Sequence, residues 1–173
     1  MRTDYTAVTV YTFDELDDEA KEKAIEGFYD LNVDYEWWDF TYEDAADIGL
    51  KITGFDIYHH QITGELTEYA DNVASAIMEK HGAETGTYKL ANRFLLEMDI
   101  YVDGERAKNR EDYTDEDYEE EFWDYSTQEF LRALLEEYLS MLRQEYEYLT
   151  SEEAIIDTIR ANEYEFTKDG KLY

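Results

Sequence analysis

The distribution of acidic residues constrains the fold of this chain more than any other feature of its sequence. Residues 24–50 and residues 111–131 are rich in aspartate and glutamate, and neither stretch contains a lysine or an arginine. Like charges one helical turn apart destabilise a helix by roughly a few tenths of a kcal/mol per pair. Folding with two such stretches requires an apolar core that offsets the repulsion, and it indicates that something other than stability selected the acids.

The chain as a whole is strongly acidic. Its 173 residues include 45 acidic and 15 basic side chains, and its formal net charge is −30 at pH 7. A negative field of this size repels DNA, RNA and anionic membrane surfaces, which argues against direct binding to any of them. Basic proteins are the natural partners, and these include the basic clefts in which nucleases hold DNA or RNA.

The aromatic content indicates that the chain folds despite its charge. A high net charge combined with a mean hydropathy of −0.72 is typical of disordered chains. Against disorder, 16% of the residues are aromatic, and the apolar residues recur at helical and strand spacings. We therefore expect a folded protein whose stability rises with salt, because salt screens the repulsion between its charges.

The residue types that are absent from the sequence indicate the cellular compartment in which the protein works. The sequence contains no cysteine and no proline. Without cysteine, disulfides and thiolate zinc sites are excluded, which fits a reducing cytoplasm. No apolar run reaches the ~18 residues that span a bilayer, and residues 1–15 lack the apolar core of a signal peptide. We expect one domain over residues 1–173, with residues 103–125 as a candidate acidic extension.

Helical spacing of apolar residues predicts most of the secondary structure. The clearest stripe comprises Phe130, Leu131, Leu134, Leu135, Tyr138, Leu139 and Leu142. The side chains expected to cap helices are Thr12, Thr67, Ser126 and Ser151, with Glu15 and Glu129 completing capping boxes. The expected helices cover a segment from Thr12 to Leu31 and residues 34–49, 67–81, 87–101, 126–142 and 151–159, and residues 103–111 are expected to form a charged loop.

Three segments predict strands. Residues 5–11 alternate and are rich in β-branched and aromatic residues. Residues 50–66 predict a hairpin that turns near His59 and His60, with a bulge at Gly54. Asp169-Gly170 suits a two-residue hairpin turn near the C-terminus. The predicted fold class is α+β: a mainly helical single domain with a small antiparallel sheet that joins the N-terminal strand to one or both hairpins.

The sequence offers no recognisable catalytic or metal-binding motif. Two of its three histidines, His59 and His60, are adjacent in a predicted turn, and adjacent strand residues point to opposite faces. Residues 115–117 begin like a calcium-binding EF-hand loop, but the glycine needed at position six is missing. Carboxylates are so numerous that no acid–base pair stands out. We therefore predict no catalytic residue, no metal site, no cofactor and no enzymatic activity.

The two acidic stretches predict a recognition surface instead. Carboxylates three or four residues apart on a helix lie about 5–6 Å from each other at Cβ, so a rigid helix can present charge as a nucleic-acid backbone does. Aromatic residues interleave with the acids, and the exposed ones can anchor an interface. The predicted partner-contacting residues are Asp34, Glu36, Asp39, Glu43, Asp44, Asp47, Glu111, Asp112, Asp115, Glu116, Asp117, Glu119, Glu120, Glu121 and Asp124.

Three blocks of the sequence resemble a family of small acidic proteins encoded by phages, prophages and other mobile elements of bacteria. The blocks are YTFDELDDEAKEKAIEGFYDLNVDYEWWDF at 11–40, LKITGFDI at 50–57 and LTSEEAIIDTIRANEYEFTKDG at 149–170. The resemblance implies a setting in the cytoplasm of a bacterial host cell. Acidic proteins from such sources include counter-defence factors, among them anti-CRISPR and anti-restriction DNA mimics.

The first functional hypothesis is a phage-type inhibitor that mimics nucleic acid. It would occupy the basic DNA- or RNA-binding cleft of a bacterial defence nuclease, with a CRISPR effector as the leading candidate. The main alternative is an acidic regulator or an antitoxin-like protein that caps another basic protein. A purely solubilising surface and a metal-dependent enzyme are the less favoured alternatives, and the sequence leaves a homodimer open.

Overall fold

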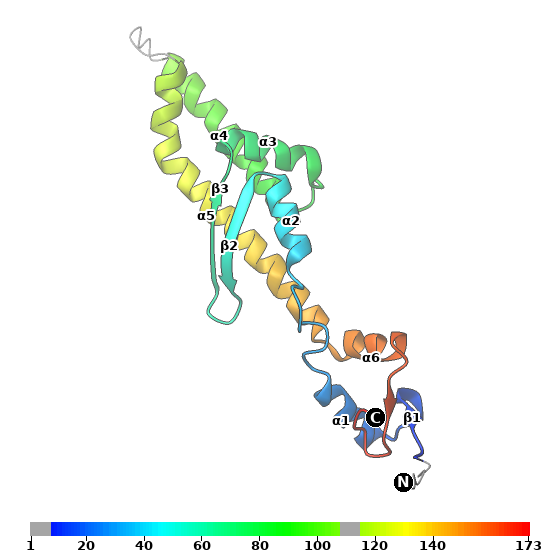
Figure 1. Cartoon of the computed structure of the whole chain (residues 1–173). Helices are drawn as coiled ribbons and strands as arrows, with labels where there is room; N and C mark the ends of the chain where they lie inside the picture. Colours follow the sequence, from blue (N-terminus) through cyan, green and yellow to red (C-terminus); the bar gives the residue numbers. More distant parts are fainter. Residues whose placement is uncertain (1–7, 108–114) are drawn as a thin grey trace. The chain divides into compact units, whose positions relative to one another are not determined.

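The computed structural model describes residues 8–107 and 115–173. In chain order its elements are β1 (Tyr11–Thr12), the 3-10 helix η1 (Phe13–Glu15), α1 (Asp18–Gly27), α2 (Asp39–Asp47), β2 (Leu50–Asp56), β3 (Gln61–Leu66), α3 (Ala70–Lys80), α4 (Gly86–Ala107), α5 (Asp115–Leu149), α6 (Glu152–Ala161) and β4 (Glu165–Phe166) (Figure 1). Helices dominate and the strands pair antiparallel, which confirms the predicted α+β class.

The chain divides into two compact units. The terminal unit comprises residues 1–37 and 144–173, and the central unit comprises residues 38–143. The last residues of α5 therefore belong to the terminal unit. The single domain over residues 1–173 stays a prediction.

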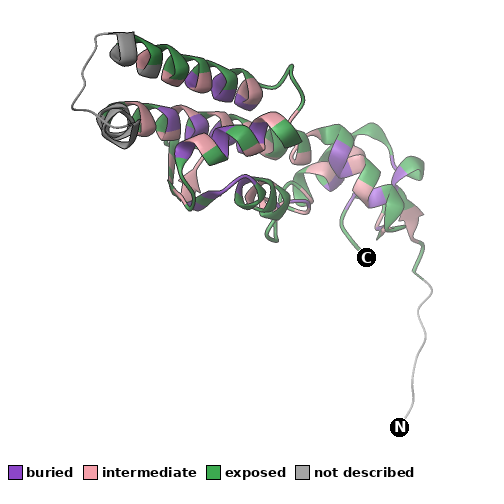
Figure 2. Cartoon of the chain, turned by 90° about the horizontal axis from the view of Figure 1, so that it is seen from above, coloured by how far each residue is buried: buried purple, intermediate pink, exposed green. Residues whose placement is uncertain are grey.

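A hairpin and helices α2 to α5 build the central unit. Strands β2 and β3 pair antiparallel, and their register shifts between Ile52 and Gly54, which confirms the predicted bulge. The long helices carry buried residues along one side and exposed residues along the other (Figure 2). The α5 stripe faces the core as predicted. The core residues are Ala45, Ile48, Leu50, Ile52, Ala70, Val73, Ala74, Ile77, Leu90, Ala91, Phe94, Phe130, Leu134, Leu135 and Tyr138.

The terminal unit joins the two ends of the described chain. Strand β1 pairs antiparallel with β4, and Tyr11 lies opposite Phe166, so the N-terminal strand pairs with the C-terminal segment. The predicted strand over 5–11 is shorter than expected: residues 8–10 are not in a strand, and residues 5–7 lie outside the described part. The buried core residues are Phe13, Leu16, Ala20, Ala24, Ile155, Ile159 and Phe166.

The prediction of a helix from residue 34 is wrong at its start, because α2 begins at Asp39. Two long-range contacts hold the preceding segment in turns. The buried Asn32 side chain donates a hydrogen bond to the carbonyl oxygen of Leu149 (3.0 Å). The buried Trp37 ring packs against Tyr146, with 5.7 Å between the ring centroids. These tertiary contacts override the local helical pattern.

Three predicted helix ends also differ from the structure. The Thr67 hydroxyl donates to the carbonyl oxygen of Gly49 (3.1 Å), and α3 begins later, at Ala70. Ser126 lies inside α5, which starts at Asp115. No glycine or proline interrupts residues 115–149, so good helix formers such as glutamate extend the helix toward its N-terminus. Helix α4 continues to Ala107, past the predicted end at 101, so residues 103–107 of the predicted loop are helical; residues 108–111 lie outside the described residues.

Two predicted caps are confirmed. The Glu15 carboxylate accepts a hydrogen bond from the backbone N–H of Thr12 (2.9 Å), as a capping box requires. This bond, with a second from the Thr12 hydroxyl, lowers the pKa of Glu15. The Ser151 hydroxyl accepts a hydrogen bond from the backbone N–H of Ala154 (3.3 Å) at the start of α6.

Candidate acidic interface on helix α2

Helix α2 is fixed to the central unit by its inner side. Ala45 and Ile48 are buried in the central core, and Tyr42 packs against that core. Because residues three or four apart share one side of a helix, this pattern turns Asp39, Glu43 and Asp47 to the opposite side. All three are exposed. The result is a row of carboxylates, each one turn from the next, on a helix that the core holds in place.

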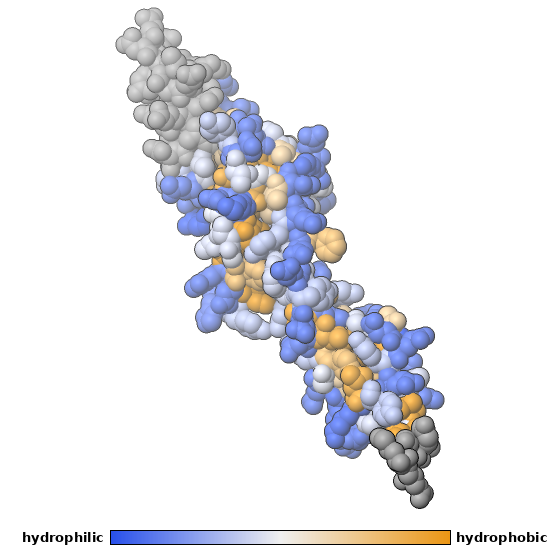
Figure 3. Space-filling model, in the orientation of Figure 1, coloured by the Kyte–Doolittle hydropathy of each residue, from blue (hydrophilic) through white to orange (hydrophobic). Residues whose placement is uncertain are grey.

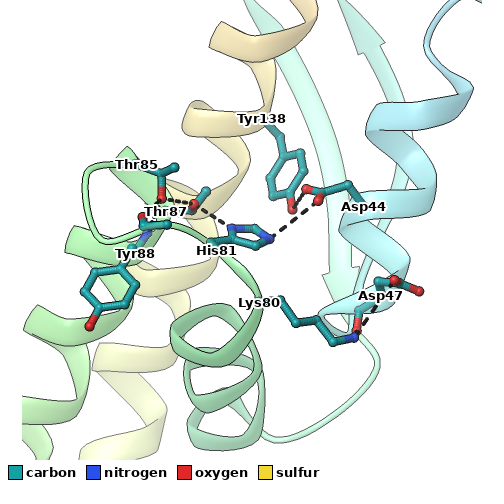
Figure 4. Close-up of polar contacts among 9 residues, drawn as sticks. Asp44, Asp47, Lys80, His81, Thr85, Thr87, Tyr88 and Tyr138 are labelled. Carbon is teal, nitrogen blue, oxygen red and sulfur yellow. Dashed lines mark hydrogen bonds and ion pairs between the residues drawn. The ribbon is translucent and has the colours of Figure 1, made fainter.

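Asp44 lies beside this row but bonds to the interior. Its carboxylate Oδ2 accepts a hydrogen bond of 2.7 Å from the hydroxyl of Tyr138, which comes from α5 and is fully buried (Figure 4). Burial, with the hydrogen bond and negative charge of Asp44, raises the pKa of the Tyr138 hydroxyl. That hydroxyl therefore stays a donor, and the Asp44 side chain remains 49% exposed.

His81 extends the contact from Asp44 to α4. Its Nε2 lies 3.6 Å from Oδ1 of Asp44, and its Nδ1 lies 2.7 Å from the hydroxyl oxygen of Thr87 (Figure 4). Thr87 is fully buried at the start of α4, and its hydroxyl lies 3.1 Å from that of Thr85. One chain of polar contacts thus links α2, the end of α3, the start of α4 and α5. A network of this kind orients the elements that it joins.

Lys80 supports the C-terminal end of α2. Its ammonium group donates a hydrogen bond of 2.5 Å to the carbonyl oxygen of Asp47 and lies 4.0 Å from the Asp47 carboxylate (Figure 4). A carboxylate at a helix C-terminus is unfavourable, because the helix dipole is negative there. The lysine from α3 offsets this cost, and the Asp47 side chain remains largely exposed.

The hydrogen bond between Tyr138 and Asp44 should stabilise the protein measurably. Tyr138→Phe removes the hydroxyl donor to Asp44 and keeps the buried ring, so the free energy of unfolding should fall by about 1 kcal/mol. Hydrogen bonds to charged groups often contribute more than this. The loss should be smaller here because, in the variant, water can hydrogen-bond to the half-exposed Asp44 carboxylate. Urea denaturation measures it. Tyr125→Phe, at an exposed position of α5, is the control and should change stability by less than about 0.5 kcal/mol. Equal effects of the two substitutions would contradict a stabilising Asp44–Tyr138 bond.

The other predicted partner-contacting residues are placed only in part. Asp34 and Glu36 are exposed in the terminal unit, between α1 and α2 rather than on a helix. Glu111 and Asp112 lie outside the described residues. Seven predicted residues lie in the N-terminal part of α5, where the structure describes the helix but not the side chains: Asp115, Glu116, Asp117, Glu119, Glu120, Glu121 and Asp124. The structure therefore brings together four predicted residues, all on α2.

Hydrophilic residues cover much of the visible surface of both units, with hydrophobic residues between them (Figure 3).

Within residues 8–107 and 115–173, no group of three or more histidine, aspartate or glutamate side chains is placed to hold a metal ion. His59 instead pairs with Asp56, with 2.7 Å between its Nδ1 and the carboxylate. Among the described helices, none has the length and apolar character needed to cross a bilayer.

Comparisons with known proteins add no relative: no family model, no curated protein and no solved structure matches the chain. The resemblance to acidic phage and prophage proteins therefore stays a prediction from the three sequence blocks.

Proposed function

We propose that this protein is an inhibitor that mimics nucleic acid and binds the basic DNA- or RNA-binding cleft of a bacterial defence nuclease. The observation that carries the proposal is the exposed row of Asp39, Glu43 and Asp47 on a core-anchored helix. Carboxylates one turn apart form a fixed line of negative charge, as phosphates do along a strand. A basic cleft that evolved to bind phosphates would attract such a line.

Rigidity is what makes this surface a mimic rather than an acidic tail. The inner side of α2 is buried, Asp44 is bonded to Tyr138, and Lys80 holds the carbonyl oxygen of Asp47. The charges are therefore ordered before binding, and the partner does not have to bear the entropy cost of ordering them. Long-range attraction between the −30 chain and a basic cleft would also speed association at low salt.

The choice of a defence nuclease rests on the sequence resemblance and the charge together. Phages and mobile elements gain from blocking host nucleases, and a CRISPR effector offers several basic clefts that hold nucleic acid by its backbone. The alternative, an acidic regulator or antitoxin-like protein, would use the same face on a different basic protein. Competition with nucleic acid separates the two proposals, because only the mimic must displace DNA or RNA.

The charge row can be tested without changing the fold. Asp39→Asn/Glu43→Gln/Asp47→Asn removes three exposed charges from α2. The charge of Asp39 stabilises α2 at its N-terminus, and the charge of Asp47 destabilises α2 at its C-terminus. Removing both charges therefore has opposing effects on helix stability. Each carboxylate in contact with a basic cleft contributes roughly 0.5–1 kcal/mol. Affinity for the nuclease should then fall by roughly 10- to 100-fold, measured by displacement of fluorescein-labelled target DNA from a guide-loaded CRISPR effector.

The matched control removes the same amount of charge elsewhere. Glu22→Gln/Glu26→Gln/Glu147→Gln changes three exposed glutamates on α1 and α5, and it should reduce affinity much less than the α2 variant. The α2 variant should also flatten the dependence of binding on salt. If the two variants weaken displacement equally, the lower net charge causes the effect, and α2 does not contact the nuclease.

A further inference from the structure

Phe40 is an exposed aromatic residue that the fold does not explain. Its side chain is 84% exposed, more than any other large hydrophobic residue in the described part of the chain. It lies on α2 and belongs to neither hydrophobic core. Phenylalanine is also a poorer helix former than alanine, leucine or glutamate, so helix stability does not favour it at an exposed position.

Acids of α2 lie next to this ring. Glu43 and Asp44 follow Phe40 by three and four residues and are its neighbours on the helix surface, and Asp47 lies one turn beyond Glu43. Glu43 and Asp47 are exposed, whereas Asp44 is half-exposed and bonded to Tyr138. The face therefore combines an exposed aromatic ring with carboxylates on neighbouring positions of a fixed helix.

We propose that α2 imitates an unstacked nucleotide, and that its partner is a protein cleft that binds single-stranded nucleic acid. The Phe40 ring takes the place of a base, and the exposed carboxylates take the place of phosphates. Clefts for single strands combine a basic groove with aromatic side chains on which bases stack, whatever the base. In a duplex the bases are stacked inside and half or more of the protein contacts go to the backbone, so an exposed ring would add little.

This inference rests on the proposed function and specifies the cleft. Charge complementarity selects a basic protein as the occupant of the α2 face. A second copy of the chain carries the same net charge of −30 and is repelled, as is an anionic membrane. Among basic proteins, the exposed ring favours those whose cleft has aromatic side chains on which bases stack.

The test uses the whole 173-residue chain and a guide-loaded CRISPR effector with fluorescein-labelled single-stranded and duplex DNA. Phe40→Ala should raise the concentration of chain that releases half of the single strand at least tenfold. Phe40→Trp should retain displacement, because indole also stacks on aromatic side chains. Tyr69→Ala removes another exposed ring of the central unit and should leave displacement unchanged. The salt dependence of Phe40→Ala should match the original chain, because no charge is lost.

The outcomes separate this inference from the proposed function. If Phe40→Ala displaces the single strand as well as the original chain, while the triple α2 variant does not, the nucleotide imitation is wrong and the mimic stands. Release of the duplex alone would also overturn the inference. If the original chain releases neither DNA, both proposals are wrong. Circular dichroism and thermal unfolding of Phe40→Ala should match the original chain, because the ring lies outside both cores.

Discussion

Replacing Phe166 with alanine should lower the free energy of unfolding by about 3–5 kcal/mol. Phe166 is fully buried in the small core of the terminal unit. Its ring packs edge-on against Phe13 and Phe28, with centroid distances of 6.3 and 5.8 Å. Phe166 also lies opposite Tyr11 in the β1–β4 pair; alanine keeps the backbone pairing but removes the ring that buries β4 in the core. Urea denaturation followed by near-ultraviolet circular dichroism measures the change.

The same substitution at Phe40 is the control for Phe166. That side chain is exposed on α2, so Phe40→Ala removes as many atoms but leaves no cavity. It should change the free energy of unfolding by less than about 0.5 kcal/mol. A loss below about 1 kcal/mol for Phe166→Ala would show that the terminal unit does not depend on this ring, contrary to its packing against Phe13 and Phe28.

Replacing Gly170 with alanine should cost about 2–5 kcal/mol of stability, which is the second large effect. Gly170 has a φ of +82°, a conformation that costs an L-residue about 1–2 kcal/mol. A Cβ at this position would also collide with the carbonyl oxygen of Ala20, and it would lie 2.9 Å from the Ala20 carbonyl carbon. That backbone belongs to α1 and cannot move as a flexible side chain would, so overpacking adds about 1–3 kcal/mol.

Gly27→Ala provides the comparison for Gly170. Gly27 ends α1, and a Cβ there would meet no atom within 4 Å. Alanine is the better helix former, so stability should stay the same or rise by up to about 1 kcal/mol. Thermal unfolding of both variants measures the difference. A Gly170→Ala protein as stable as Gly27→Ala would contradict the close approach of the C-terminal turn to α1.

The elements with regular local patterns could be predicted from the sequence. The apolar stripe of α5 follows from helical spacing, and the β2–β3 hairpin follows from strand parity and the bulge at Gly54. A turn forms at the predicted Asp169-Gly170, but it is one residue longer than the predicted two-residue turn: the Thr167 backbone N–H donates to the carbonyl oxygen of Lys171 (2.8 Å), which leaves residues 168–170 in the loop. In each case the signal lies within a few neighbouring residues.

The features that depend on distant residues could not be predicted. Asn32 and Leu149 are 117 positions apart, yet their hydrogen bond holds the segment before α2 in turns. Asp44 and Tyr138 are 94 positions apart. In the sequence, nothing therefore distinguishes Asp44 from the many other acidic residues. The available signal was Tyr138 itself, because a tyrosine on a buried stripe requires a partner for its hydroxyl. The sequence could not identify which carboxylate accepts that bond.

Displacement of labelled DNA from a guide-loaded CRISPR effector by the original chain tests the central claim most directly. Added chain should release the DNA, and the product should be a complex of chain and effector without DNA. Raising the salt concentration should weaken the chain's binding steeply, because the interface is formed by many charges. A ternary complex that holds both the chain and DNA, with the affinity for DNA unchanged, would contradict nucleic-acid mimicry.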